Sequence, residues 1–528
     1  MASAWWQQGV IYQIYPRSFM DSNSDGVGDL QGIIERLDYL NDGTEQSLGI
    51  DAIWISPFYP SPMADFGYDV ADYCNVDPMF GDLATFDTLV TEAHKRNIKI
   101  IVDFVPNHSS SQHDWFKTSR SSKDNSKRDW YIWKDAKADG SLPNNWQSVF
   151  GGPAWTLDET TGQYYFHQFD PAQPDLNWRN PDVKDAMLDV LRFWLERGVD
   201  GFRMDVVYMI WKHPDMPDHY SDARDVIDNS DLDEQHPAFD YPGIQDIFAE
   251  MRQILDEYDA IGIAEVWLSD EKRNAYFEHF EMPFNFDFLT YETRFKWDAD
   301  FFRDAVEAYE TSLPEGAFAN YVLGSHDVPR LASRYDSQDR ARQAAMLLLT
   351  LRGTPTLYNG DEIGMVNGDI AEDQLRDPQG INMGVEHTRD VCRTPMQWDD
   401  SDYAGFSTTE TWLPVNEDYR VRNVALQDED TTSILNLYRR LIWYRKHHPS
   451  LSIGTYQAID VPDNIYAYLR QHEDEHHLII LNFGNTTQIV TFDGAGQIVM
   501  NTHLNRQDEI VNSQVEIASN EGVLIRLD

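Results

Sequence analysis

Short apolar runs alternate along the chain with longer stretches of helical periodicity, and this alternation limits the folds that the sequence can adopt. Strand–helix–strand repeats on this scale are typical of parallel βαβ units and an α/β fold. Seven strand-like runs spread over about 350 residues favour a (β/α)8 barrel over an open sheet. The candidate strands are residues 9–16, 50–57, 98–105, 199–206, 260–267, 320–327 and 354–362.

Helical patterns occupy the intervals between several of these runs. Residues 83–97 form one pattern. Residues 181–198 form another, with Pro181 at the start and Gly198 at the end, as expected for helix boundaries. The sixth strand of the barrel is the least distinct in the sequence, and residues 282–289 are our candidate for it.

Two segments interrupt the barrel pattern. The polar, aromatic stretch after the third strand is too long for a loop and predicts an inserted domain. After about residue 452 the helical pattern gives way to short strands and turns, which predict an antiparallel β-domain. We therefore expect a barrel in two parts with two added domains. The parts are 1–104 and 174–451 for the barrel, 105–173 for the inserted domain B and 452–528 for a C-terminal β-sandwich.

The charge balance excludes several classes of partner. The 89 Asp and Glu residues outnumber the 42 Lys and Arg residues, and the net charge of −47 repels nucleic acid and anionic lipid. No run approaches the ~18 apolar residues of a membrane helix, and the N-terminal residues lack the regions of a signal peptide. We therefore expect a cytoplasmic protein without a membrane partner. The only cysteines, Cys74 and Cys392, do not form a disulfide framework.

The acidic excess is spread along the chain, which indicates adaptation to a salty environment. Added salt screens the repulsion among surface carboxylates, so molar NaCl should raise the melting temperature above its low-salt value. Thermal melting at both salt concentrations measures this. An unchanged melting temperature would contradict the hypothesis.

Acidic side chains follow several of the candidate strands. Catalytic groups of a (β/α)8 barrel come from the C-terminal ends of its strands. A single Asp at such a place is more often a helix cap or turn former, but a set that converges on one barrel mouth predicts an active site. The set consists of Asp103, Asn107 and His108 after the third strand, Arg203 and Asp205 after the fourth, Glu265 after the fifth, and His326 and Asp327 after the seventh.

Glycoside hydrolysis is the chemistry that fits these groups. One carboxylate attacks or stabilises the anomeric carbon, and a second, protonated one gives a proton to the leaving oxygen. Asp205 suits the first role, because Arg203 lies two residues earlier on the same strand face and would keep it ionised. Glu265 suits the acid/base role, and Asp327 would hold sugar hydroxyls.

The motifs DFVPNHSSSQHDWF (103–116), GFRMDV (201–206), IAEVW (263–267) and SHDVPR (325–330) resemble, in order and spacing, the four signature regions of glycoside hydrolase family 13, the α-amylase family. GYDVADY, FGGPAW, QPDLNW and RTPMQW resemble its α-glucosidase and oligo-1,6-glucosidase branch. The resemblance covers essentially the whole chain. It implies an exo-acting, retaining α-glucosidase with Asp205 as nucleophile, Glu265 as acid/base and Asp327 as transition-state stabiliser.

The same resemblance implies the sugar-binding residues. Those expected to hold the non-reducing glucose are Asp65, Tyr68, His108, Arg203, His326 and Arg393, and those lining the pocket are Phe150, Phe169 and Gln173. A clamp between Asp65 and Arg393 would close the pocket beyond this sugar. The chain departs from the family at Ser325, where the family usually has Asn.

Linkage preference depends on the residue after the expected nucleophile. Val206 resembles the α-1,6-active members, whereas Ala or Thr often accompanies α-1,4 specificity. A β-branched residue at a buried strand end is also simply a good strand former. We expect α-1,6 or mixed activity, with transfer of glucose to other acceptors at high sugar concentration.

The segment DSNSDGVGDL (21–30) opens like an EF-hand calcium loop. The bidentate Glu that closes such a loop is replaced by Gly32. The same loop in related α-glucosidases holds Ca²⁺ or Mg²⁺, so we expect a structural cation rather than a calcium sensor, with a bare turn as the alternative. The expected ligands are Asp21, Asn23, Asp25, the carbonyl of Val27, and Asp29, about five oxygens where Ca²⁺ prefers 6–8.

No nucleotide-binding glycine motif and no HExxH zinc motif occurs, so we expect no organic cofactor and no catalytic zinc. The run HEDEHH (472–477) is interpreted as a solvated turn. The expected partner is a small oligosaccharide or glucoside, and the expected assembly is a monomer or homodimer. Two alternatives are a sucrose isomerase or trehalose synthase, although YETRFKWD (291–298) matches the isomerase loop RLDRD poorly, and a non-enzymatic transporter heavy chain.

Overall fold

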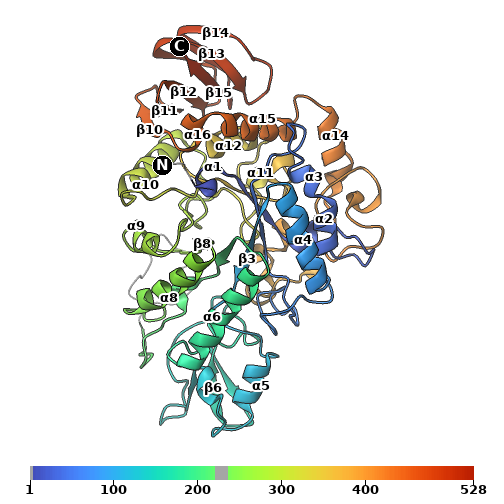
Figure 1. The fold of residues 1–528 in the computed structure, drawn as a ribbon, viewed down its shortest axis with the longest axis vertical. Coiled ribbons are helices and arrows are strands. Elements are labelled where there is room, and N and C mark those ends of the chain that lie inside the picture. Colours follow the sequence, from blue (N-terminus) through green and yellow to red (C-terminus); the bar gives the residue numbers. More distant parts are fainter. Residues whose placement is uncertain (1–3, 220–235) are drawn as a thin grey trace.

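A parallel sheet forms the centre of the computed structural model, which describes residues 4–219 and 236–528 (Figure 1). Its strands run in the order β8-β7-β3-β2-β1-β9, all parallel. Their bounds are β1 Ile11–Ile14, β2 Ala52–Ile55, β3 Lys99–Phe104, β7 Gly201–Met204, β8 Ile261–Ala264 and β9 Thr356–Tyr358. Each of these strands lies within a run predicted from the sequence.

Two further segments close this sheet into a barrel. Met282 and Phe284 donate backbone hydrogen bonds to Gly262 and Ala264 beside β8. Single parallel bridges then join Asn285 to Tyr321, and residue 322 to residue 356 of β9. The weak sixth candidate, 282–289, therefore takes the place predicted for it, although its pairing is too short to be a regular strand. The predicted (β/α)8 barrel is confirmed.

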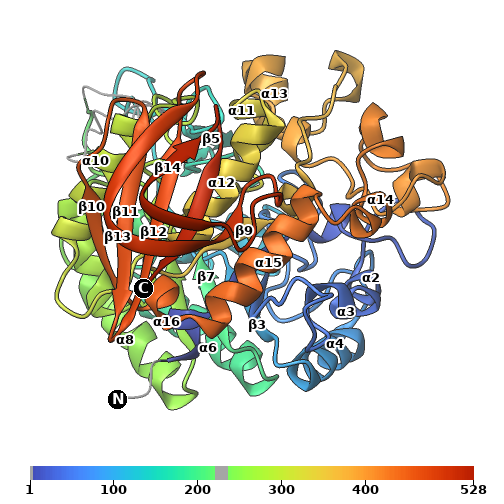
Figure 2. The ribbon, with the colours of Figure 1, turned by 90° about the horizontal axis from the view of Figure 1, so that it is seen from above.

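Helices cover the outside of the barrel (Figures 1 and 2). Asn180 caps α6 by accepting a hydrogen bond from Asp182, and Pro181 occupies the first turn, where its missing N–H costs nothing. The α-helices from the barrel part are α1 Trp5–Gln8, α2 Leu30–Glu35, α3 Leu37–Leu40, α4 Leu83–Lys95, α6 Pro181–Glu196, α8 Ile244–Glu257, α9 Asp270–Arg273, α10 Ala299–Ser312, α11 Leu331–Arg334, α12 Gln338–Thr350, α13 Pro378–Met383, α14 Val424–Glu429, α15 Ile434–His447 and α16 Pro449–Ser452.

The stretch after β3 forms a small unit of its own at one end of the molecule (Figure 1). It contains α5 Asp114–Arg120 and an antiparallel sheet in the order β4-β6-β5, with bounds Trp133–Lys134, Gln163–Phe166 and Trp155–Asp158. Because this unit leaves the barrel at the C-terminal end of β3, its loops stand over the end of the barrel where the predicted catalytic groups lie.

The C-terminal part is one continuous antiparallel sheet rather than the two sheets of the β-sandwich that we expected. Its order is β10-β11-β12-β15-β13-β14, with bounds Thr455–Ile459, Ile465–His472, Glu475–Asn482, Gly522–Leu527, Gln488–Asn501 and Ile510–Ile517. The long β13 shifts register after Thr491 and after Ile498. These irregularities bend the strand, so β13 is a single long strand where the sequence predicted only short ones.

Two buried arginines connect this sheet to the barrel. Arg445 of α15 donates to the carbonyls of Leu349 and Leu451 at 3.0 and 2.6 Å. Arg470 of β11 donates to the same Leu451 carbonyl at 2.8 Å. Carbonyl oxygens, rather than water, accept the hydrogen bonds of the buried Arg445 guanidinium. Burial also lowers the pKa of Arg445 to about 9. Among the described residues, no helix is both long and apolar enough to cross a bilayer.

Candidate functional site

The predicted acids meet at the C-terminal ends of the barrel strands. Asp103 and Arg203 are direct partners across the β3–β7 ladder, and Asp205 follows the last residue of β7. Glu265 follows the end of β8 in the same way. Because parallel strands present their C-terminal ends at one edge, residues 100 and 62 positions apart in the chain become neighbours.

One guanidinium holds three of these carboxylates. Arg203 Nη1 contacts Asp103 Oδ1 at 2.6 Å and Asp205 Oδ1 at 2.5 Å. Its Nη2 contacts Glu265 Oε2 at 2.6 Å. Glu265 also accepts hydrogen bonds from the backbone N–H of Val206 at 2.9 Å and from the Trp267 indole at 3.0 Å. All members of this cluster are buried, so their mutual distances are fixed by packing as well as by charge.

Ionising all three carboxylates around one cation costs free energy, because the negative charges repel one another. Burial raises the pKa of Asp103 to about 6, against the opposing effect of Arg203. Burial, together with the charges of Glu265 and Asp103, raises the pKa of Asp205 well above its ordinary value, although Arg203 opposes this. We expected Arg203 to keep Asp205 ionised. Arg203 does lower the pKa of Asp205, but burial and the charges of Glu265 and Asp103 act in the opposite direction.

Asp327 has a different electrostatic environment on the opposite side of the site. Arg393 Nη2 contacts its Oδ1 at 3.0 Å, and Arg389 Nη1 contacts the same oxygen at 3.3 Å. Burial by itself raises the pKa of Asp327, but His326, Arg389 and Arg393 outweigh burial and hold the pKa below its ordinary value. Asp327 thus differs from Asp103 and Asp205, because its pKa is lowered whereas theirs are raised.

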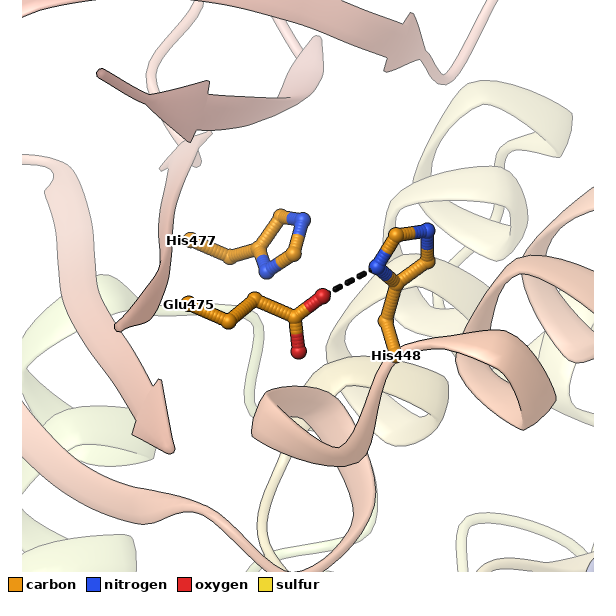
Figure 3. A group of neighbouring side chains, drawn as sticks. All are labelled: His448, Glu475 and His477. Carbon is orange, nitrogen blue, oxygen red and sulfur yellow. Dashed lines mark hydrogen bonds and ion pairs between the residues drawn. The ribbon is translucent and has the colours of Figure 1, made fainter. Parts of the chain in front are cut away.

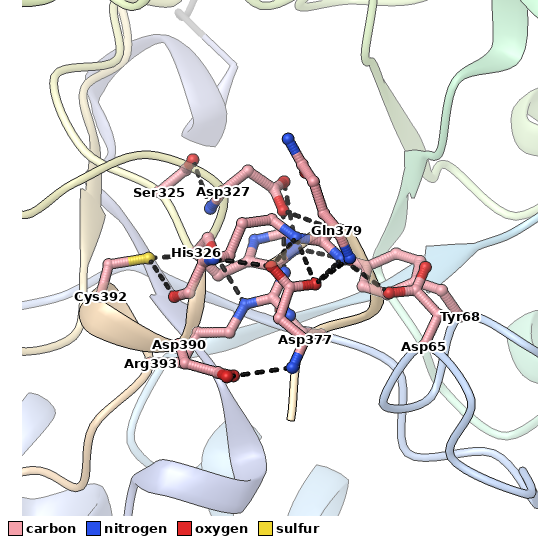
Figure 4. Close-up of polar contacts among 12 residues, drawn as sticks. Asp65, Tyr68, Ser325, His326, Asp327, Asp377, Gln379, Asp390, Cys392 and Arg393 are labelled. Carbon is pink, nitrogen blue, oxygen red and sulfur yellow. Dashed lines mark hydrogen bonds and ion pairs between the residues drawn. The ribbon is translucent and has the colours of Figure 1, made fainter. Parts of the chain in front are cut away.

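The predicted clamp between Asp65 and Arg393 is wrong. Asp65 Oδ1 pairs with Arg389 Nη2 at 2.8 Å, and the same nitrogen reaches Asp377 Oδ1 at 2.6 Å. Arg393 is instead turned toward the carbonyl of His326, to which its Nε donates at 2.8 Å (Figure 4). Both arginines reach Asp327, but only Arg389 also pairs with Asp65 and Asp377.

The Gln173 side chain contacts Asp65 and His108 rather than lining the cavity. Its amide nitrogen donates to Asp65 Oδ2 at 3.0 Å and lies 3.1 Å from His108 Nε2. Burial lowers the pKa of His108 to about 4, so this ring is neutral near pH 7. Ser325, at the position that departs from the family, accepts a hydrogen bond from the Asp327 backbone at 3.2 Å.

These groups surround a cavity of about 150 Å³. Pockets for drug-sized ligands have volumes of roughly 300–1,000 Å³. The smaller cavity in this protein therefore suits one sugar-sized ring rather than an extended chain. Most of the predicted residues line it, whereas Gln173 and Arg393 act through their contacts with Asp65 and Asp327. The predicted lining residues are Asp65, Tyr68, His108, Phe150, Phe169, Arg203, Asp205, Val206, Glu265, His326 and Asp327.

The structure adds lining residues that the sequence reasoning did not assign. Arg389 could have been suspected from its position four residues before Arg393, and Trp267 from its position two residues after Glu265. Tyr291 and Arg294 belong to the segment that was considered only as a poor match to an isomerase loop. The others are Val149, Tyr208, Leu289, Val328 and Gln379.

Val206 is not part of the strand, contrary to its interpretation as a strand former. Its backbone is left-handed, with φ 34° and ψ 40°. This conformation is rare and strained for a β-branched residue. In this conformation the Val206 N–H points at the Glu265 carboxylate, so the strained backbone contributes a donor to the site.

The acidic loop at residues 21–30 lies between β1 and α2. Asp21 and Asp29 are buried, whereas Asn23 and Asp25 are exposed. Asp29 caps α2 by accepting from Gly32 at 2.7 Å, and Asp21 accepts from several N–H groups of its own loop. Among the ion pairs of the described residues, none joins Asp21, Asp25 or Asp29 to a basic side chain.

Three comparisons with known proteins agree on the kind of protein that carries this site. The family model described as alpha amylase, catalytic domain, matches residues 13–454. A probable alpha-glucosidase of Rhizobium meliloti (strain 1021) is 39% identical over 503 residues, which cover 91% of this chain and 90% of the relative. The oligo-1,6-glucosidase of Parageobacillus thermoglucosidasius is 39% identical over 528 residues, covering 93% and 92%. The crystal structure of the trehalulose synthase from Pseudomonas mesoacidophila MX-45 matches with a TM-score of 0.91 at 35% identity over 100% of both chains.

Two of the three acids that contact Arg389, Asp65 and Asp377, should respond to pH in opposite ways. Burial raises the pKa of Asp65 to about 6, so the stability that this group contributes is complete below its unfolded pKa of about 3.9 and is lost as pH rises through about 6. Asp65→Asn should therefore raise the melting temperature more at pH 8 than at pH 5.

Asp377→Asn is the matched control. Burial raises the pKa of Asp377, but Arg389 outweighs this and lowers it, so its contribution is present above the unfolded pKa and is lost only in acid. Asp377→Asn should lower the melting temperature at pH 5 and at pH 8. Melting curves of both variants across this range measure the effect, and parallel pH profiles would contradict the assignment.

Proposed function

Because the chain belongs to the α-amylase family of glycoside hydrolases, we propose that it is an exo-acting, retaining α-glucosidase. Its substrates are disaccharides and short oligosaccharides with a terminal α-linked glucose. The observation that carries this proposal is the small cavity that these acids line. Asp205 and Glu265 both contact Arg203 there, and the Asp65–Arg389 ion pair forms another part of the cavity wall. A cavity of this size admits one terminal sugar, and an exo-acting enzyme needs no more.

In this mechanism, Asp205 attacks the anomeric carbon and Glu265 protonates the leaving oxygen. Retaining glycosidases place the two carboxyl groups about 5 Å apart. Asp205 and Glu265 contact different terminal nitrogens of the Arg203 guanidinium, and this arrangement is compatible with that spacing. Contacts with Arg203 Nη2, the Val206 N–H and the Trp267 indole hold the Glu265 carboxyl in the cavity wall, where it can reach the leaving oxygen. Water then hydrolyses the covalent intermediate, with Glu265 acting as base.

Asp327 and the arginines bind and orient the sugar. An ionised carboxylate that is anchored by Arg389 and Arg393 accepts hydrogen bonds from sugar hydroxyls without moving. Asp65 and His108 would hold hydroxyls at the far end of the same ring, with Gln173 fixing both. A second sugar that takes the place of water gives transglucosylation.

A glucosyl isomerase of the sucrose isomerase or trehalose synthase type is the second candidate. The similarity to a trehalulose synthase favours it, and Tyr291 and Arg294 contribute side chains to the cavity from the segment where the isomerase motif would lie. Such an enzyme would return an isomerised disaccharide from sucrose, whereas the proposed hydrolase returns free glucose. Product analysis on maltose, isomaltose, trehalose and sucrose separates the two.

Asp205→Ala should abolish turnover, lowering kcat by at least about 10⁴-fold, because no other group can form the covalent intermediate. The matched control is Asp200→Asn at the opposite end of the same strand, where Asp200 contacts His94 and Lys99 outside the pocket. It should retain kcat. Glucose release from maltose and isomaltose measures both variants, and full hydrolysis by Asp205→Ala would overturn the mechanism.

Val206→Thr tests the proposed α-1,6 or mixed linkage preference. Val206 lies in the cavity wall directly after Asp205, so its side chain contacts the region between the cleaved sugar and the next one. The variant should shift the ratio of kcat/KM for isomaltose to that for maltose toward maltose by about tenfold, which corresponds to about 1.4 kcal/mol. Val206→Ile keeps an apolar β-branched side chain and serves as the control. An unchanged ratio in Val206→Thr would show that this residue does not set linkage.

We also propose that the loop at residues 21–30 binds a structural Ca²⁺ or Mg²⁺. Burial raises the pKa of Asp29, with Asp21 adding to the effect, and a divalent cation would relieve this repulsion. Asp21, Asn23, Asp25, Asp29 and the Val27 carbonyl would supply oxygens, with water completing the shell. The ion would stiffen the first loop of the barrel and take no part in the chemistry.

Removal of this cation with EDTA should lower the melting temperature, and excess Ca²⁺ or Mg²⁺ should restore it. The exposed Asp25 makes Asp25→Ala a suitable control, because this variant should melt at the same temperature with and without EDTA. Metal analysis accompanies the melting curves. If EDTA changes neither melting nor bound calcium and magnesium, the loop is a bare turn.

A further inference from the structure

Two histidines and a glutamate form a compact cluster where the last barrel helices meet the C-terminal sheet (Figure 3). His448 lies between α15 and α16, and Glu475 and His477 lie on β12. The interpretation of residues 472–477 as a solvated turn is wrong for four of the six, since only residues 473–474 form the turn. His477 is fully buried, and His448 and Glu475 are partly buried.

We propose that this cluster binds one divalent transition-metal ion of the zinc type. Two imidazoles and one carboxylate are a donor set that zinc prefers. One ligand atom from each residue lies within 4.8 Å of the other two. Ligand atoms about 2.1 Å from a tetrahedral ion are about 3.4 Å from one another, so small side-chain adjustments bring all three into range.

Neighbouring groups already orient the three ligands. The Tyr444 hydroxyl lies 2.7 Å from His477 Nε2, and the Ser450 backbone N–H donates to Glu475 Oε2 at 3.0 Å. Partners of this kind fix the ring and the carboxylate of metal ligands. Nδ1 of His477 faces the Ser450 hydroxyl at 2.8 Å, and the ion would take the place of that hydroxyl. Figure 3 shows a nitrogen of His477 and Nδ1 of His448 turned toward the same carboxylate.

The cluster also has a route to solvent. A cavity of about 550 Å³ has Tyr444 and His448 in its wall. Water from this cavity would complete a four-coordinate shell around three protein ligands. Because none of the three ligands lines the sugar cavity, the ion would not act in hydrolysis. It would join the end of α15 to β12 and so strengthen the attachment of the C-terminal sheet to the barrel.

Zinc binding to the metal-free, full-length protein tests this proposal. Titration calorimetry with ZnCl₂ is performed in excess Ca²⁺, which occupies sites made of oxygen alone. We expect one tight site per chain, and His448→Ala and Glu475→Gln should each weaken it at least tenfold. The control, His476→Ala, removes a histidine from the opposite face of the same strand and should bind zinc like the unaltered protein.

Cobalt and melting measurements distinguish a metal site from a hydrogen-bond network. Co²⁺ should give the visible absorption of a four-coordinate ion in the unaltered protein and in His476→Ala, but not in His448→Ala. Zinc at a hundredfold excess over Kd should raise the melting temperature by about 2 °C in the same two proteins. Glucose release should be equal in all of them, so the outcome does not depend on the proposed sugar chemistry.

His448 is partly exposed, so His448→Ala should fold, and its metal-free melting curve checks this. If the unaltered protein takes up no zinc, or if His448→Ala binds it equally well, the cluster is a hydrogen-bond network only and the proposal is wrong.

Discussion

The contact of one buried guanidinium with three buried carboxylates is the constraint on which the site depends. Arg203 is held from β7 between Asp103 on β3 and the acids after β7 and β8. Removing the cation would leave three carboxylates in a low-dielectric interior, at a cost of several kcal/mol. With the cation present, the three acids stay in contact with one guanidinium, so the groups proposed to attack and to protonate are held close together.

A second set of charges gives the site its asymmetry. Arg389 and Arg393 anchor Asp327 as an ion, while burial keeps Asp65 easier to protonate. Both carboxylates are buried near the same arginines. Their pKa values differ because His326 adds to the effect of Arg389 and Arg393 on Asp327, whereas the neighbouring Asp377 opposes these arginines at Asp65. The inserted unit adds Phe150 and Phe169 to the cavity wall, and the Phe150 ring packs 5.0 Å from the guanidinium of Arg389. A sugar ring, with polar edges and apolar faces, matches such a cavity.

The sequence predicted most of the architecture because its signals were local. Apolar runs followed by acids located the barrel strands, and Pro181 marked the start of α6. The C-terminal sheet was predicted less well, since the bends in β13 depend on which strands pair with each half of it. Likewise, nothing in the sequence states which of Arg389 and Arg393 reaches Asp65, because the answer depends on the turn that separates them.

The sequence by itself determined which chemical groups the protein carries and at which strand ends they lie. Strand periodicity and strand-end motifs depend only on residues that are close together in the sequence. Only the tertiary structure decided which acids contact Arg203, which arginine holds Asp65, and that Val206 is forced into a left-handed conformation toward Glu265. It also brought His448 to Glu475 and His477, 27 and 29 positions further along the chain. These features arise from barrel closure and the docking of the C-terminal sheet, which bring together residues that have no relation along the chain.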